Sequence, residues 1–305
     1  MPSVTILLCT YNGGIYLEEQ LNSIVNQTYK NWNIIVSDDC SEDNTLDILN
    51  KFQKLLGKDK MTIMQGPQQG FSMNFLSLIS KQNLNSNFFA FSDQDDIWEP
   101  EKLSRGLDYI QIQDQSKTAL YCSRTKLIDK KSSSLGFSPL FKREPSFHNA
   151  LVQSLAGGNT MIINKKTLEL MKLIGLKKIV SHDWLIYQIV TGTNGFIKYD
   201  SWPSVMYRQH DKNKIGNNMT LSARIVRLYR FLKGDLRRWI TSNIAALRTI
   251  ENYLTDESRI IISELEKLRK NSWIKNLVII KNIKFYRQTF IGNVALYIGF
   301  LIKKI

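Results

Sequence analysis

The sequence lacks the features that mark several large protein classes. Its 305 residues include only three cysteines, Cys9, Cys40 and Cys122, which are far apart and form no CxxC pair. A sparse and odd set of this kind argues against a disulfide scaffold or a zinc site and suits a reducing cytoplasm. There is no GxxxxGK[ST] or GxGxxG segment, which weakens the P-loop and ordinary dinucleotide-binding interpretations.

Long apolar runs are also missing. The N-terminal stretch MPSVTILLCTYN has no basic region before its apolar residues, so it predicts a buried strand rather than a signal peptide. Residues 290–302 are apolar over 13 positions, with Asn293 among them, whereas a bilayer span needs about 20. We therefore expect a cytoplasmic protein without a membrane-spanning segment.

Acidic residues become scarce toward the C-terminus. Residues 222–305 carry 17 Lys and Arg against 6 Asp and Glu, whereas residues 1–221 carry 24 against 21. A nearly neutral body with a strongly basic tail predicts an anionic partner, either nucleic acid or an acidic membrane surface. We expect the tail to form helices that dock on the body and lie on a membrane interface. The alternatives are a solvated helical face or a contact within a homo-oligomer.

What the body does contain is an alternation of strand and helix patterns. Apolar runs predict strands at residues 4–9, 33–37, 61–64 and 87–91. Helical spacing follows at residues 15–27, after a cap at Ser41 or Asp43, and at residues 71–79. This order predicts an α/β fold with a mainly parallel sheet covered on both faces. Ligands bind such sheets at the carboxyl ends of the strands, which is where the polar clusters TYN, DD and DQDD fall.

The segment FFAFSDQDDIWEP places three carboxylates directly after one of these strands. Asp93 and Asp95 are alternate residues of an extended segment, so both can approach one cation. Mg²⁺ and Mn²⁺ prefer oxygen ligands and often join a few carboxylates to a substrate diphosphate. A metal would also remove the mutual repulsion of the carboxylates. The alternative is a solvated turn in which Asp96 caps the next helix.

Two further strand ends carry groups suited to a nucleotide. In SDDCSEDNT, Asp38 or Asp39 can accept a hydrogen bond from a base or a ribose hydroxyl. The alternative is helix capping, which Ser41 and Asp43 could supply without them. Tyr11 can stack on a base, or it can be an ordinary turn residue.

Later segments add candidates for catalysis. Asp183 in SHDWLIYQIV stands at the start of an apolar helical pattern, either as a helix cap or as a general base beside His182. Gly157 and Gly158 precede a strand, where paired glycines permit close approach of a ligand or form a bulge. The cation-rich segment YRQHDKNKIG suits a loop that closes over phosphates, and a solvated basic linker is the alternative.

Taken together, these segments resemble the family 2 glycosyltransferases with the GT-A fold. The resemblance covers about residues 3–216 and depends on LLCTYNGGIYLEEQLNSIVNQTYKNWNIIVSDDCSEDNT, GPQQGFSMNF, FSDQDDIWEPEKL, AGGNTMIIN, SHDW and YRQHDKNKIG. The combination of DQDDIW, GG-x-T, HDW and YRQH also resembles bacterial rhamnosyltransferases of cell-wall and O-antigen polysaccharide synthesis. It implies a Rossmann-like, mainly parallel GT-A sheet with helices on both faces over residues 1–216. A basic α-helical segment, membrane-associating in our interpretation, would follow over residues 217–305.

The resemblance implies a role for each matching position. Asp183 matches the catalytic base. Asp93 and Asp95 match the pair that holds Mg²⁺ or Mn²⁺, with Asp95 the expected direct ligand. The implied donor-nucleotide contacts are Thr10, Tyr11, Asn12, Asp38, Asp39, Asp93 and Gln94. Contacts to the diphosphate, sugar or acceptor are implied for Gly157, Gly158, His182, Trp184, Arg208 and His210.

The implied reaction is one in-line displacement with inversion. Asp183 removes a proton from an acceptor hydroxyl as it attacks the anomeric carbon, and the metal, with Arg208 or His210, balances charge on the departing nucleoside diphosphate. The expected donor is dTDP-L-rhamnose, and the alternative is a UDP-hexose such as UDP-glucose or UDP-galactose. The expected acceptor is a polyprenyl diphosphate-linked glycan at the inner face of the bacterial cell membrane. There the basic tail would hold a peripheral enzyme.

Three other interpretations fit the sequence less well. A nucleotidyltransferase would want a basic, glycine-rich loop after the first strand, and TYNGGIYLEE carries acids there. A nucleic-acid-binding protein would use the basic tail but leaves the carboxylates at the strand ends unexplained, so no nucleic acid is expected. A glycoside hydrolase would need paired carboxylates but no nucleotide or metal site.

Overall fold

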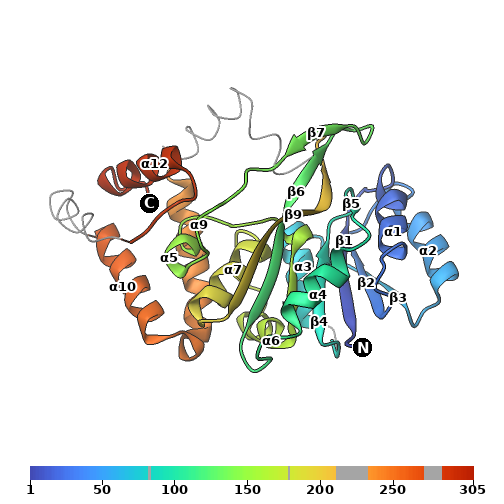
Figure 1. Cartoon of the computed structure of the whole chain (residues 1–305), viewed down its shortest axis with the longest axis horizontal. Helices are drawn as coiled ribbons and strands as arrows, with labels where there is room; N and C mark the ends of the chain where they lie inside the picture. The colour runs from blue at the N-terminus through green and yellow to red at the C-terminus, as the bar shows by residue number, and fades with distance from the viewer. Residues whose placement is uncertain (82–83, 178, 211–232, 271–283) are drawn as a thin grey trace.

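The computed structural model describes residues 1–305 except 82–83, 178, 211–232 and 271–283 (Figure 1). The described strands form one sheet with the order β3-β2-β1-β4-β8-β6-β9-β5, and β7 pairs with β6. The strands are β1 Val4–Thr10, β2 Trp32–Asp38, β3 Met61–Gln65, β4 Phe88–Ser92, β5 Ile97–Trp98, β6 Ala119–Ile128, β7 Ser134–Phe137, β8 Ile162–Asn164 and β9 Phe196–Arg208. The helices are α1 Leu17–Val25, α2 Thr45–Leu56, α3 Phe71–Lys81, α4 Lys102–Ile110, α5 Phe147–Ala150, η1 Gly158–Thr160, α6 Lys165–Ile174, α7 His182–Gly192, α9 Asp235–Leu247, η2 Arg248–Tyr253, α10 Asp256–Lys270 and α12 Phe290–Leu301.

The N-terminal half of the sheet is parallel and covered on both faces. β3, β2, β1 and β4 pair in parallel, and all seven residues of β1 are buried. Alternate residues of β1 belong to two separate cores. Ile6 and Leu8 pack with residues of α1, α2 and α4, whereas Leu7 and Cys9 pack with residues of α3 and α7. The strands and helices predicted for this half are therefore confirmed, as is the α/β class.

The C-terminal half of the sheet is more mixed than the alternation predicted. β8 pairs antiparallel to both β4 and β6, β9 pairs in parallel with β6, and β5 pairs antiparallel to β9. β5 consists of Ile97 and Trp98, which join Met206 and Val205 of β9. This short ladder fixes the DQDD segment next to the end of β9, so the antiparallel half of the sheet positions the carboxylates.

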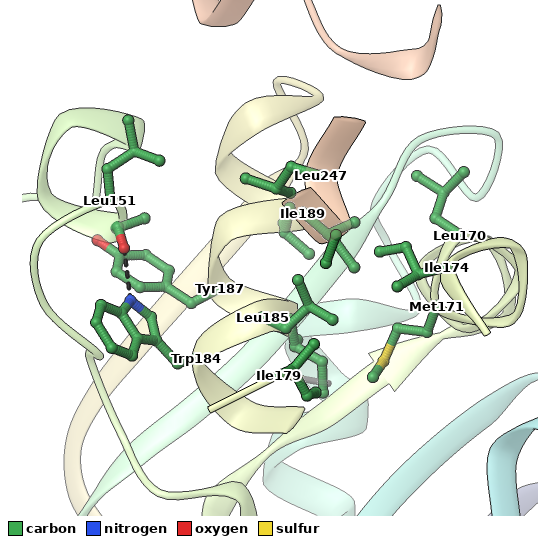
Figure 2. Packing of buried hydrophobic residues seen from close by; sticks show 14 of the residues in the cluster. Leu151, Leu170, Met171, Ile174, Ile179, Trp184, Leu185, Tyr187, Ile189 and Leu247 are labelled. Atoms are coloured by element: carbon green, nitrogen blue, oxygen red, sulfur yellow. Dashed lines mark hydrogen bonds between the residues drawn. The ribbon is translucent and has the colours of Figure 1, made fainter. Parts of the chain in front are cut away.

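The C-terminal helices pack on the body rather than apart from it. Residues of α9, α10 and α12, including Leu247, Leu265 and Phe300, belong to the same buried cluster as residues of α3, α6 and α7. Figure 2 shows Leu247 of α9 beside Ile189 of α7. The predicted boundary between residues 216 and 217 lies outside the described residues, as do residues 217–232 and 271–283 of the predicted helical segment. Within the described part of the chain, no helix is both long and apolar enough to cross a bilayer.

Candidate active site

The predicted polar clusters meet at one edge of the sheet. Thr10 at the end of β1 is in register with Asp38 at the end of β2. On the other side of β1, Leu8 is in register with Ser92, which ends β4. Because these three strands are parallel, the segments TYN, DD and DQDD leave the sheet together. The structure therefore brings the three clusters into one site, as the sequence predicted.

A reciprocal pair of hydrogen bonds joins the first cluster to the third. The backbone N–H of Tyr11 donates to Oε1 of Gln94 at 2.7 Å, and Nε2 of Gln94 donates to the Tyr11 carbonyl at 3.0 Å. The pairing needs a small residue nearby, since a Cβ on Gly13 would lie 2.4 Å from Oε1 of Gln94. The Tyr11 side chain remains 57% exposed, so its ring is accessible to a ligand at this edge.

Asp38, which ends β2, and Asp39, which follows it, mainly organise loops. Asp38 accepts hydrogen bonds from Thr10 Oγ1 at 2.7 Å and from the backbone N–H of Ser41 at 2.8 Å. Asp39 accepts the backbone N–H of Gly70 at 3.1 Å. Asn12, with a positive φ of 47°, donates its backbone N–H to Ser41 Oγ at 2.8 Å. These bonds hold the loops in shape, and direct contacts of the four predicted residues with a nucleotide remain a prediction.

Three carboxylates, Asp93, Asp95 and Asp183, lie near one another beyond the end of β4. Burial, followed by the negative charges of Asp95 and Asp183, raises the pKa of Asp93 to about 7. Such a raised pKa means that ionising all of these neighbouring carboxylates costs free energy unless a cation compensates their charge. The predicted general base and the predicted metal ligands therefore belong to a single electrostatic cluster.

The carboxylates fit a divalent cation that is shared with a substrate. Among the described residues, no group of three or more His, Cys, Asp and Glu side chains is arranged as a complete metal cage. Mg²⁺ and Mn²⁺ do not require one, since they are commonly held by one or two carboxylates together with substrate phosphates. Asp93 and Asp95 supply the hard oxygen donors, and the raised pKa of Asp93 is the effect that a bound cation would reverse.

His210 and Arg208 reach the DQD segment in different ways. His210 Nε2 lies 2.7 Å from Oδ2 of Asp95, and its ring stacks on Tyr16 with centroids 5.3 Å apart.

Arg208 ends β9 and is fully buried. Its Nε donates to the Asp95 carbonyl at 3.0 Å, and its guanidinium also pairs with Glu19. The donors of Arg208 support the surrounding loops, and its contact with a diphosphate stays a prediction. Residues 211–216 of the predicted closing loop lie outside the described residues.

The predicted catalytic helix α7 begins with three neighbours in three environments. Asp183 is buried to 8% exposure in the first turn and accepts the backbone N–H of Trp184. Asp183 is not the cap of α7, because Ser181 occupies the cap position. The Trp184 side chain lies in the core, where its indole N–H donates to the Ala150 carbonyl at 2.6 Å (Figure 2). Trp184 therefore anchors α7 and is not available for the predicted sugar or acceptor contact.

His182 is the most unusual of the three. Its ring lies 4.0 Å from the ring of Phe75 and 5.0 Å from that of Phe91, measured between centroids. Neither ring nitrogen has a hydrogen-bond partner among the described residues, and burial lowers the pKa to about 4. Gly158 makes room for this ring, since a Cβ there would lie 2.2 Å from Nε2. A Cβ on Gly157 would instead lie 2.7 Å from Oδ1 of Asn159, so this glycine shapes the loop before η1.

Comparison with known proteins places this arrangement in a family. A model described as glycosyl transferase family 2 matches residues 5–166. The dTDP-rhamnosyl transferase RfbG of Shigella flexneri is 33% identical over 267 residues, which is 82% of this chain and 86% of that protein. The chain belongs to glycosyltransferase family 2. The predicted family, and the resemblance to bacterial rhamnosyltransferases, are thereby confirmed.

Solved structures agree on the fold of this glycosyltransferase. The chain aligns with S. aureus TarS 1-349 in complex with UDP-GlcNAc at a TM-score of 0.53 and 20% identity, over 69% of this chain and 60% of that one. It also aligns with GalNAc-T7 with UDP, GalNAc and Mn²⁺ at a TM-score of 0.52 and 10% identity, over 76% of this chain and 48% of that one. These glycosyltransferase likenesses concern the fold alone and confirm the predicted GT-A class.

The site of the glycosyltransferase also contains a buried polar network that the sequence did not predict. Asp96 is fully buried, and one of its oxygens accepts Nδ2 of Asn159 at 2.5 Å. Nζ of Lys102 is equally buried and donates to the Asn159 carbonyl at 2.9 Å, above the ring of Trp98 at 4.5 Å. Burial lowers the pKa of Lys102 to about 7, and the charge of Asp96 acts in the opposite direction. The alternative in which Asp96 caps the next helix is wrong, because its side chain faces this network and Glu101 occupies the cap position of α4.

Proposed function

We propose that this glycosyltransferase transfers L-rhamnose from dTDP-L-rhamnose, with inversion and with Mg²⁺ or Mn²⁺, to a growing surface polysaccharide. The observation that carries the choice of sugar is the 33% identity to a dTDP-rhamnosyl transferase over 82% of the chain. The carboxylate cluster of Asp93, Asp95 and Asp183 carries the choice of mechanism. The proposed acceptor is a polyprenyl diphosphate-linked glycan at the cytoplasmic face of the membrane.

In the proposed mechanism Asp183 is the general base. Its carboxylate takes the proton of an acceptor hydroxyl while that oxygen forms a bond to the anomeric carbon. The bond between this carbon and the diphosphate oxygen breaks, and its electron pair leaves with the nucleoside diphosphate. Attack opposite the leaving group converts a β-linked donor into an α-L-rhamnoside. Asp183 lies in the first turn of α7, which holds its carboxylate at the edge of the site near Asp93.

The other site residues bind and orient the donor in this proposal. Asp95 and Asp93 hold the divalent cation, which when bound offsets charge on the diphosphate. Tyr11 offers an exposed ring to the base, and the hydrogen bonds between Tyr11 and Gln94 fix it relative to the carboxylates. Arg208 acts as a positioning residue, because its donor to the Asp95 carbonyl fixes the backbone that presents the metal ligand.

Turnover of a panel of nucleotide sugars tests the proposal. The purified protein is incubated with dTDP-rhamnose, UDP-glucose, UDP-galactose and UDP-GlcNAc, first with Mg²⁺ or Mn²⁺ and then with a chelator, and nucleoside diphosphate release is followed. We expect chelator-sensitive release from dTDP-rhamnose. Release from a UDP-hexose instead would keep the enzyme class and overturn the sugar. If no donor turns over without the lipid acceptor, metal-dependent binding of each donor is measured by calorimetry, and binding of none would contradict the proposal.

A further inference from the structure

Helix α12 presents an apolar face that nothing in the described structure covers. Phe290 and Ile291 are 82% and 80% exposed. The exposed apolar face continues at Val294, Ile298 and Ile302, one helical turn apart. Three- and four-residue spacing places all five side chains on one side of the helix. An apolar stripe of this kind on a protein surface marks an interaction site.

The opposite face of α12 is anchored to the body. Leu296 and Phe300 are buried in the main core, and the ring of Phe300 lies 6.0 Å from that of Phe285. The start of the helix is capped, since Thr289 Oγ1 accepts the backbone N–H of Gly292 at 3.1 Å. The exposed stripe is therefore held in a fixed orientation.

Positive charge surrounds both ends of the stripe. Residues 284–305 contain four basic residues and no acidic residue. Lys303 and Lys304 follow the C-cap residue Ile302, and the Lys303 carbonyl accepts a hydrogen bond from Arg237 at 2.9 Å. Near the first turn, the guanidinium of Arg143 stacks over the ring of Tyr286 at 3.8 Å. Apolar residues bordered by cations match a surface that is apolar inside and anionic outside, which is the chemistry of an anionic lipid bilayer.

We propose that the exposed face of α12 docks the enzyme on an anionic lipid surface, with the helix parallel to the membrane. Twelve residues extend only about 18 Å, which is less than the roughly 30 Å of a hydrocarbon core, so α12 lies in the interface and does not cross it. In Figure 1, α12 and the carboxyl ends of the parallel strands both lie toward the upper side of the molecule. This proposal deepens the proposed function and rests on it for its biological role, because a lipid-linked acceptor would be met at such a surface.

Vesicle binding of the full-length protein tests the docking surface without any turnover. Wild-type protein is mixed with vesicles of phosphatidylcholine alone or with phosphatidylglycerol added, and the bound fraction is measured by flotation. We expect binding to the anionic vesicles. The double variant Ile291→Glu and Ile298→Glu should bind about a hundredfold more weakly, because burial of each isoleucine contributes about a tenfold factor and the two factors multiply. The matched control carries Leu55→Glu and Ile112→Glu, at exposed positions of the body, and should bind like wild type.

Three results would overturn the proposal. The first is that wild-type protein binds neither vesicle composition. Equal losses in the α12 variant and the control would show that the position of the apolar residues is irrelevant. A wild-type dimer in light scattering that the α12 variant converts to a monomer, with vesicle binding unchanged, would assign the stripe to a second copy of the chain. Unaltered metal-dependent donor binding and matching circular dichroism spectra in both variants would separate failure of the docking surface from failure of the proposed function or of folding.

Discussion

The buried ring of His182 predicts how the stability of this enzyme depends on pH. The side chain is 3% exposed, and burial lowers its pKa from 6.5 to about 4 in the folded protein. As the pH falls through 6.5, the unfolded chain binds a proton at this residue before the folded chain does. The contribution of His182 to the free energy of unfolding is therefore complete above pH 6.5 and is lost progressively as the pH falls toward about 4. Because one pKa unit corresponds to about 1.4 kcal/mol, the loss between pH 7 and pH 5 is about 2 kcal/mol.

Urea denaturation of wild type and His182→Leu at pH 7 and pH 5 measures this contribution. The variant removes the titrating group, so wild type should lose about 2 kcal/mol more than the variant between the two pH values. Only the difference between pH values is compared, so a general loss of packing in the variant does not matter. His148→Leu is the control, since this histidine is only partly buried and should change the pH dependence less. If wild type and His182→Leu lose the same free energy of unfolding between pH 7 and pH 5, then protonation of the buried ring costs nothing, and the reasoning is refuted.

Four further perturbations test the site. Asp183→Asn should keep donor binding but lower turnover by about 10²–10⁴-fold in a nucleoside diphosphate release assay, and unchanged turnover would remove Asp183 from the base role. Asp95→Ala should weaken Mn²⁺-dependent donor binding in calorimetry, and intact metal dependence would reject Asp95 as a ligand. Mn²⁺ should raise the melting temperature more at pH 8 than at pH 6, because the pKa of Asp93 is about 7 and a proton competes with the metal below it; an equal rise would contradict this. Lys102→Met should lower the free energy of unfolding by about 2 kcal/mol or more, since it removes the partner of buried polar groups; a loss no larger than that of exposed Lys58→Met would refute the role.

The sequence predicted the parallel half of the sheet because local patterns are sufficient there. The runs of β1 and β4 are buried along their whole length, and the runs of β1, β2 and β4 end in polar residues that the parallel pairing brings to one edge. The carboxylates Asp93 and Asp95 were visible for the same reason, since their crowding is local in the chain. The antiparallel placement of β8 was not predictable, because a strand of two isoleucines and Asn164 is too short to specify the direction in which it pairs.

The role of buried cations was missed because their partners are distant in sequence. Arg208 looked like a phosphate ligand in a basic segment, yet its guanidinium pairs with Glu19 near the N-terminus. The sequence gives no sign that Lys102 is buried, and only folding places its Nζ against the Asn159 carbonyl. The sequence around Arg208 and Lys102 has no local pattern that distinguishes a buried, hydrogen-bonded cation from a solvated one.

The HDW segment illustrates a further limit of reading motifs as units. Consecutive residues of a helix point about 100° apart, so three neighbours cannot all face one ligand. His182 points at Phe75 and Phe91, Trp184 points into the core toward Ala150, and Asp183 alone lies close enough to the DQD segment to influence its charge state. In our proposal the chemistry of this motif therefore rests on Asp183. The two flanking aromatic rings fix the first turn of α7, and with it the direction in which the carboxylate points.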